Sequence, residues 1–255
     1  MIQSVDRAVR VLTALQSARR ITLSDLSARL ELPPSTVHGI LRTLVCHGMV
    51  TQEHGSSRYQ LGPAVLLLGN GYLDTLELRS KAIPWAEDLA ARTGAAVRTG
   101  VLLLDDVVII HHQPRPDGSR QMAEVGIVIP AHASALGKAI LAFDDEAAGR
   151  ILAKAPLRSM TGETITLGHD LRGSLAAVRE SGVALEQDEA VLGESAVAAP
   201  VFDASGSVIG AIGVVESTTG GPLPASARTA ARDAARAISR ELGAHVWPVR
   251  PVEAG

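Results

Sequence analysis

The stretch from Leu32 to Val50, LPPSTVHGILRTLVCHGMV, constrains the fold more than any other part of the chain. At the spacing of an α-helix, one side of this stretch is apolar and is expected to pack inward: Val37, Ile40, Leu41, Leu44 and Val45. The opposite side gathers short polar groups and one guanidinium: Ser35, Thr36, His38, Gly39, Arg42 and Thr43. Pro33 and Pro34 are suited to a helix start, and Gly48 to its end. A helix with such a polar face fits the major groove of DNA.

Two further helices are expected before this one. Apolar residues recur at helical spacing from Val5 to Ala18 and again from Ile21 to Leu30, with Thr22 or Ser24 as the N-cap of the second. A tight turn then leads into the polar-faced helix, which is the helix-turn-helix arrangement. Alternating residues at 49–53 and 58–61 flank a polar tip at 54–57, which indicates a β-hairpin. The sequence therefore predicts a winged helix-turn-helix domain over residues 1–63.

The distribution of charged residues along the chain is consistent with DNA binding by the first domain alone. Residues 1–63 hold seven Lys and Arg against four Asp and Glu, whereas the whole chain has a formal net charge of −3. Binding must therefore be local, and a homodimer on double-stranded palindromic operator DNA is expected to strengthen it. We expect Arg42 to read a base, with Arg58 and the hairpin tip contacting the DNA backbone or minor groove.

Composition limits the remaining possibilities. A hydrophobic fraction of 46% is enough for a core, and six aromatic residues provide no platform for stacking single-stranded nucleic acid. No apolar run approaches the length of a membrane span, and the N-terminus lacks a signal pattern. With Cys46 as the single cysteine, no intrachain disulfide can form, which is consistent with a cytoplasmic protein.

A leucine-rich helix is expected after the first domain, from Ala64 to Arg79, within a linker region at 64–81. Its leucines are too many for one face of a helix, so we expect it to form the homodimer contact. Gly69 and Gly71 weaken this helix and favour a bend there. A separate helix is expected at 83–92.

Residues 82–255 alternate between strand and helix patterns. Strands are expected at 97–104, 107–111, 121–125, 183–186, 196–203 and 208–216. Helices are expected at 134–143, 146–155, 171–181 and 225–242. A sheet of mainly antiparallel strands flanked by helices is typical of an α+β domain that senses a ligand.

Long segments of the chain resemble the IclR-type transcriptional regulators. SVDRAVRVL, STVHGILRTL and RYQLG are similar to the DNA-binding half of that family. GIVIPAHASALGKAILA and EQDEAVLGESAVAAPVFDASGSVIGAIGV are similar to its effector-binding half. The shorter segments GYLD, ELR and HHQPRPDGSRQ resemble regulators of glycerol operons in actinomycetes. The chain differs from the family where it has Gly39 in place of a frequent arginine and Ala196 near a frequent cysteine.

The resemblance implies a winged helix-turn-helix domain joined by a linker helix to a GAF-like effector-binding domain, and a regulator that assembles as a dimer, with two dimers able to associate. We expect the effector at the start of helix 134–143, where Ser134 begins a helix with free N–H groups and Ile129, Ala135 and Leu136 form walls. The resemblance adds Gln121, Glu186 and Ala196 on the opposite side. A compact hydroxylated anion fits best, and glycerol 3-phosphate is expected before glycerol or a small carboxylate.

Two function classes remain open from the sequence, a ligand-controlled DNA-binding regulator and a metabolite-processing enzyme with a DNA-binding appendage. Ser134 and Lys138 are four residues apart, which is not the spacing of an S-x-x-K nucleophile. His111 and His112 are adjacent, so on a strand they point to opposite faces and cannot share a metal ion. The sequence shows no convergent catalytic set, no metal site and no cofactor motif, so the regulator of a catabolic operon, acting as a repressor, is favoured.

Overall fold

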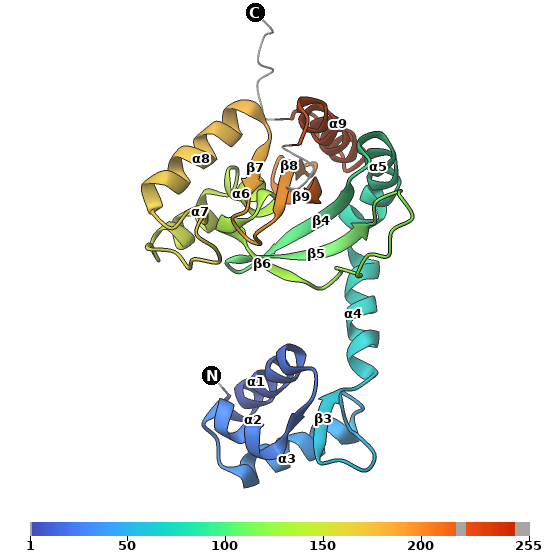
Figure 1. Cartoon of the computed structure of the whole chain (residues 1–255), viewed down its shortest axis with the longest axis vertical. Helices are drawn as coiled ribbons and strands as arrows, with labels where there is room; N and C mark the ends of the chain where they lie inside the picture. Colours follow the sequence, from blue (N-terminus) through green and yellow to red (C-terminus); the bar gives the residue numbers. More distant parts are fainter. Residues whose placement is uncertain (1, 218–222, 248–255) are drawn as a thin grey trace, which may run out of the picture. The chain divides into compact units, whose positions relative to one another are not determined.

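A computed structural model describes residues 2–217 and 223–247 of the chain (Figure 1). The chain divides into two compact units, Met1–Thr75 and Leu76–Gly255. The predicted α+β class is confirmed, with a helical unit first and a sheet covered by helices second. None of the helices in the described ranges is both long and apolar enough to cross a membrane.

The first unit has the predicted winged helix-turn-helix form. Its elements are α1 (Gln3–Ala18), β1 (Ile21–Thr22), α2 (Leu23–Leu30), α3 (Pro34–Cys46), β2 (Val50–Gln52), β3 (Arg58–Leu61) and α4 (Ala64–Thr75). Thr22 is the N-cap of α2, because its Oγ1 accepts the N–H of Asp25 at 3.2 Å. The strands form a small antiparallel sheet in the order β1-β3-β2, so the wing has a third strand from the segment before α2.

The core of this unit differs in part from the sequence expectation. Val11, Leu15, Leu26, Leu41 and Tyr59 are among its buried residues. The apolar residues at helical spacing in α1 include Val5 and Val9, which were expected to pack inward but are 57% and 56% exposed. The inward side predicted for α3 was wrong at Val45, which is 40% exposed. The core reaches only the C-terminal half of α1, so apolar surface remains at its N-terminal end.

Helix α4 ends earlier than predicted. The expected helix 64–79 stops at Thr75, Leu76 is extended, and α5 (Glu77–Thr93) follows in place of a helix beginning at residue 83. Because α5 begins six residues before the predicted start, Pro84 lies inside it and not in its first turn. Burial of one face of α5 against the sheet offsets the roughly 3 kcal/mol that an internal proline costs.

The second unit is a six-stranded antiparallel sheet in the order β6-β5-β4-β9-β8-β7. The strands are β4 (Ala96–Leu103), β5 (Asp106–Gln113), β6 (Val128–Pro130), β7 (Ala184–Gln187), β8 (Glu194–Phe202) and β9 (Val208–Ser217). A 3-10 turn, Ala131–Ala133, precedes the helices α6 (Ala135–Leu141), α7 (Asp145–Leu152), α8 (Gly168–Ser181) and α9 (Ala225–Glu241). The predicted strand at 121–125 was wrong, because Glu124 there turns to an arginine of β4 and the chain pairs with β5 only from Val128.

Helices cover both faces of this sheet, with α5 and α9 together on one face and α6 to α8 on the other (Figure 1). Glycines let helices approach closely on each side. A Cβ on Gly210 would lie 2.4 Å from Leu78 of α5, whereas a Cβ on Gly100 would lie 3.3 Å from Leu136 of α6. The two faces of the sheet can therefore carry separate sites.

Candidate DNA-binding surface and effector site

The predicted DNA-contacting face of α3 lies at the surface of the first unit. Ser35, His38, Gly39, Arg42 and Thr43 are exposed, and Thr36 is half-buried. No atom lies within 4 Å of the position that a Cβ on Gly39 would occupy, so the middle of this face is open. Arg42 has no hydrogen-bond or ion-pair partner within the described ranges, so its guanidinium is available for a base edge.

The wing presents Arg58 at the base of its polar tip. Arg58 is exposed at the start of β3, and the tip is shaped by Ser56, whose Oγ donates to Glu53 at 2.9 Å. Arg20 pairs with Glu53 at 2.8 Å, which anchors the tip to the segment after α1. The ion pair at the tip is thus made by Arg20 and Glu53, and the guanidinium of Arg58 is left available for DNA.

Six of the seven predicted effector residues line one small cavity between α6 and the sheet, which we call the inner cavity: Ile129, Ser134, Ala135, Leu136, Glu186 and Ala196. Ser134 is the N-cap of α6, because its Oγ accepts the N–H of Gly137 at 3.0 Å. The cavity volume is about 20 Å³, which is room for about one water molecule. A ligand the size of glycerol must therefore move the cavity walls apart.

Gln121, the seventh predicted residue, lies outside the inner cavity. Its amide folds onto its own segment, where Oε1 accepts the N–H of Arg115 at 2.9 Å. With Arg115 and Arg120 it lines an adjacent hollow of about 410 Å³, which we call the outer hollow. Arg98 and Glu194 line both spaces, so the two adjoin.

Arg98 is the residue that sequence reasoning missed. It lies on β4 with a side chain only 13% exposed, and its guanidinium holds Glu124 from one side and Glu194 from the other. The Arg98–Glu194 contacts measure 3.0 and 3.3 Å, and one Arg98–Glu124 contact measures 3.0 Å. Arg98 is the one basic side chain lining the inner cavity among the described residues. An alternating strand pattern predicts an outward arginine, and no local signal marks this one as buried.

Two acidic side chains beside the inner cavity have different environments. Burial raises the pKa of Glu186 to about 7, against the opposing effects of the Ala190 N–H and of Lys138. Glu189 instead forms an ion pair with Lys138 of α6 at 2.5 Å, and both side chains are almost fully buried. Near neutral pH Glu186 can thus donate or accept a hydrogen bond, while Glu189 serves as the partner of Lys138.

Comparison with known proteins agrees with this geometry in both units. The model of the IclR helix-turn-helix domain matches residues 4–54, and the model of the C-terminal domain of bacterial IclR regulators matches residues 70–240. The chain belongs to the IclR family of bacterial transcriptional regulators. It is a DNA-binding regulator with an effector-binding second domain, as the sequence predicted.

Individual relatives span nearly the whole length of the IclR-family chain. It is 44% identical to the glycerol operon regulatory protein of Streptomyces griseus and 41% identical to that of Streptomyces coelicolor. Each alignment covers 95% of this chain and 97% of the relative. The structure of an IclR regulator from Alicyclobacillus acidocaldarius superimposes with a TM-score of 0.82 at 30% identity, covering 95% of this chain and 98% of that one.

The groups that could suggest catalysis have other partners in the second unit. Ser134 caps α6 and Lys138 pairs with Glu189, so these two side chains do not form a nucleophile and base. His112 Nε2 lies 3.8 Å from Glu124, whereas His111 lies near Arg79 and Glu87 of α5, so the two rings diverge as expected. Among the described residues no three His, Cys, Asp or Glu side chains gather in a way that could hold a metal ion.

Proposed function

We propose that this regulator represses a glycerol catabolic operon and releases its operator when glycerol 3-phosphate binds the second unit. The relatives named above support the choice of operon, because they are glycerol operon regulators at 41–44% identity over 95% of the chain. The observation that carries an effector in the second unit is the inner cavity, where six predicted residues from α6, β6, β7 and β8 converge.

The chemistry of the cavity fits a hydroxylated anion. Glu186 exchanges hydrogen bonds with hydroxyl groups, and Ser134 with Leu136 borders the space where the ligand would lie. Helix α6 has only seven residues, so its N-terminal dipole is a weak anchor, and Arg98 supplies the stronger positive charge. The phosphate would displace Glu194 or Glu124 from Arg98, and the loss of either contact loosens the cavity wall.

Ligand binding and operator binding are then linked by the two states of the protein. An effector that binds the opened cavity favours the state with the wall displaced, and operator DNA favours the closed state. The affinity of glycerol 3-phosphate must fall in the presence of operator by the same factor by which the ligand weakens operator binding. Binding to both forms with equal affinity would exclude glycerol 3-phosphate as the controlling ligand.

Glu186 gives this effector site a pH dependence. Its pKa of about 7 makes the side chain mostly neutral at pH 6 and mostly anionic at pH 8. The carboxylate repels a phosphate, so we expect the dissociation constant of glycerol 3-phosphate to rise about tenfold between these pH values. Calorimetric titration measures it, with Glu186→Gln as the variant that cannot ionise and neutral glycerol as the control ligand. The ligand's own phosphate loses its second proton at about pH 6, so the contribution of Glu186 is the difference in slope between the two proteins. Equal slopes in both would show that Glu186 is not responsible.

Operator recognition is proposed to use the exposed face of α3 in the major groove and Arg58 at the backbone or minor groove. Arg42→Ala should weaken binding to the operator by about 1–3 kcal/mol and relax the preference at one base pair. Arg58→Ala should weaken binding to all sequences equally and reduce its salt dependence. Gel shifts on the operator and on single-base variants separate the two results. If Arg42→Ala lowers affinity equally for every variant, Arg42 does not read a base.

Assembly as a homodimer is proposed because one winged domain with an excess of three positive charges binds too weakly for specific control. The dimer would match a palindromic operator, and two dimers could associate through their second units. Light scattering at micromolar concentration distinguishes monomer, dimer and tetramer. A monomer that binds the operator tightly would overturn this proposal.

Two other functions have less support than the regulation of a glycerol operon. A regulator of another catabolic pathway that responds to a small carboxylate would use the same Arg98 and Ser134, and it differs only in the ligand that dissociates the operator complex. A metabolite-processing enzyme would turn that ligand over. Incubation of the protein with each candidate, followed by product analysis, tests the second alternative.

A further inference from the structure

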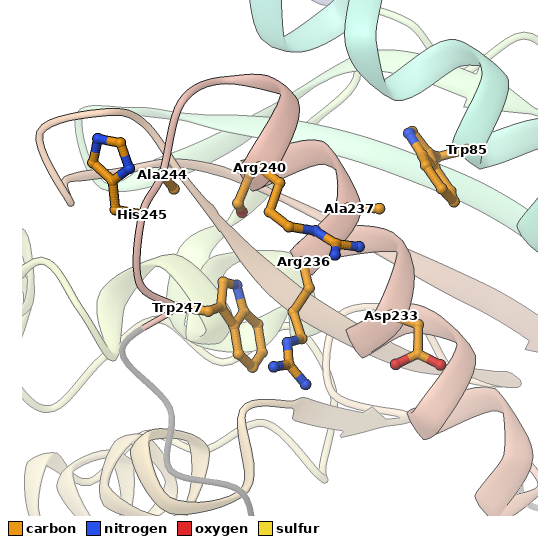
Figure 2. A pocket seen from close by; sticks show the side chains of 9 residues that line it. Trp85, Asp233, Arg236, Ala237, Arg240, Ala244, His245 and Trp247 are labelled. Atoms are coloured by element: carbon orange, nitrogen blue, oxygen red, sulfur yellow. The ribbon is translucent and has the colours of Figure 1, made fainter.

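A second hollow lies on the face of the sheet that α5 and α9 cover, away from the inner cavity (Figure 2). Its volume is about 460 Å³, which is within the range of small-molecule sites. Both tryptophans of the chain line it, Trp85 from α5 and Trp247 from the segment after α9. A chain with six aromatic residues among 255 thus directs its two largest ones to one surface depression.

Hydrogen bonds fix both indole rings. Trp247 Nε1 donates to the carbonyl of Pro200 at 3.2 Å, and its ring meets Phe202 edge-to-face with centroids 6.2 Å apart. Trp85 Nε1 donates to Glu241 at 2.8 Å. Because both N–H groups already have acceptors, a ligand can engage the two indoles only through their ring surfaces, as Arg236 does over the Trp247 ring.

The charges around the hollow are mainly positive. Arg236 lies 5.7 Å from the centre of the Trp247 ring, and the guanidinium of Arg240 lies between the two indoles in the view of Figure 2. Neither arginine forms an ion pair in the described ranges, and His245 lines the same space. Asp233 is the single acidic residue in the lining. Two guanidinium groups without carboxylate partners are suited to an anionic group.

The geometry points to a second ligand site in this hollow, which takes a flat aromatic ring carrying a phosphate or carboxylate. The ring would stack on Trp247 or Trp85, and the anionic group would accept hydrogen bonds from Arg236 and Arg240. The concave shape and the volume favour a small molecule over a protein surface. Only Leu76 separates α5 from the linker helix α4. A ligand that holds α5 against α9 therefore acts on the helix that directly follows the linker.

The two tryptophans provide a direct test, since all tryptophan fluorescence of the full-length protein comes from this site. We expect AMP and nicotinate to quench it in a saturable way, AMP testing the phosphate and nicotinate the carboxylate. Adenosine lacks the charge and ribose 5-phosphate lacks the aromatic ring, so each should bind at least about tenfold more weakly than AMP. Trp85→Phe and Trp247→Phe, measured separately, show whether both rings respond.

Arg236→Gln combined with Arg240→Gln should weaken AMP about tenfold or more and leave adenosine unchanged. The matched control is Arg150→Gln with Arg172→Gln, which removes two exposed arginines from α7 and α8 on the other face. Circular dichroism verifies that both double variants are folded. Quenching that is absent, equal for AMP and adenosine, or unchanged in the Arg236/Arg240 variant would overturn the site. Self-association that is lost in the Arg236/Arg240 variant but kept in the Arg150/Arg172 control, without saturable quenching, would instead assign the hollow to a protein contact and overturn the ligand site.

Discussion

Lys138→Met is expected to lower the free energy of unfolding of the second unit by about 3–5 kcal/mol. Lys138 lies on α6 with its side chain only 1% exposed, and its ammonium group forms an ion pair with Glu189 at 2.5 Å. Methionine fills nearly the same volume but leaves the Glu189 carboxylate buried without a cation. The second oxygen of Glu189 already has no hydrogen-bond partner in the described structure, so no neighbour compensates. Denaturant unfolding followed by tryptophan fluorescence measures this, because both tryptophans belong to the second unit.

A double-substitution cycle distinguishes the lost ion pair from lost packing. Lys138→Met with Glu189→Gln removes both charges, and we expect it to recover more than half of the lost stability. The hydroxyls of Thr161 and Thr164 donate to the backbone carbonyls of residues 188 and 189, so the backbone there should keep its position in the double variant. If the double variant is as unstable as Lys138→Met alone, packing around the lysine stem explains the loss and the buried ion pair does not.

Local sequence patterns were enough to predict the two kinds of domain and most of their helices. The α3 helix was predicted within two residues because prolines begin it and Gly48 ends it, which are effects within one turn of a helix. The strand at 121–125 and the helix to Arg79 were wrong because their outcomes depend on distant partners. Glu124 turns toward Arg98, and residues 77–79 belong to α5, which packs on the sheet of the second unit after the extended Leu76.

In the candidate effector site too, residues fixed by local sequence could be predicted and residues fixed by distant contacts could not. Ser134, Ala135 and Leu136 were placed together because they begin one helix, and Glu186 with Ala196 came from the family resemblance. Arg98 could not be found, because its burial arises from Glu124 and Glu194, which lie 26 and 96 residues away in the sequence. Gln121 lines the outer hollow and not the inner cavity, because the loop around it closes on Arg115, a contact that no periodic pattern encodes.

Leu67→Gln combined with Leu68→Gln is expected to dissociate the proposed dimer and to reduce operator affinity about 100-fold or more. These side chains are 74% and 65% exposed on α4, a helix in which no residue is buried within its own unit. Contiguous exposed leucines indicate a surface that another chain covers, and a dimer gains affinity because its second α3 helix binds an adjacent half-site. Analytical ultracentrifugation measures the dimer, and gel shifts on full and half operators measure the binding.

The matched control for this result is Leu103→Gln with Leu104→Gln, at the end of β4 and in the turn to β5, where the leucines are 50% and 79% exposed. Both double variants replace two exposed leucines and leave the net charge unchanged, so their general effects on solubility should be similar. Because glutamine is a good helix former, α4 itself should persist in the first variant. The α4 variant should bind a half operator as well as the unaltered protein does, while losing its advantage on the full palindrome. A dimer that survives the α4 substitutions, or an operator affinity that falls equally in the control, would mean that the leucines of α4 do not form the interface.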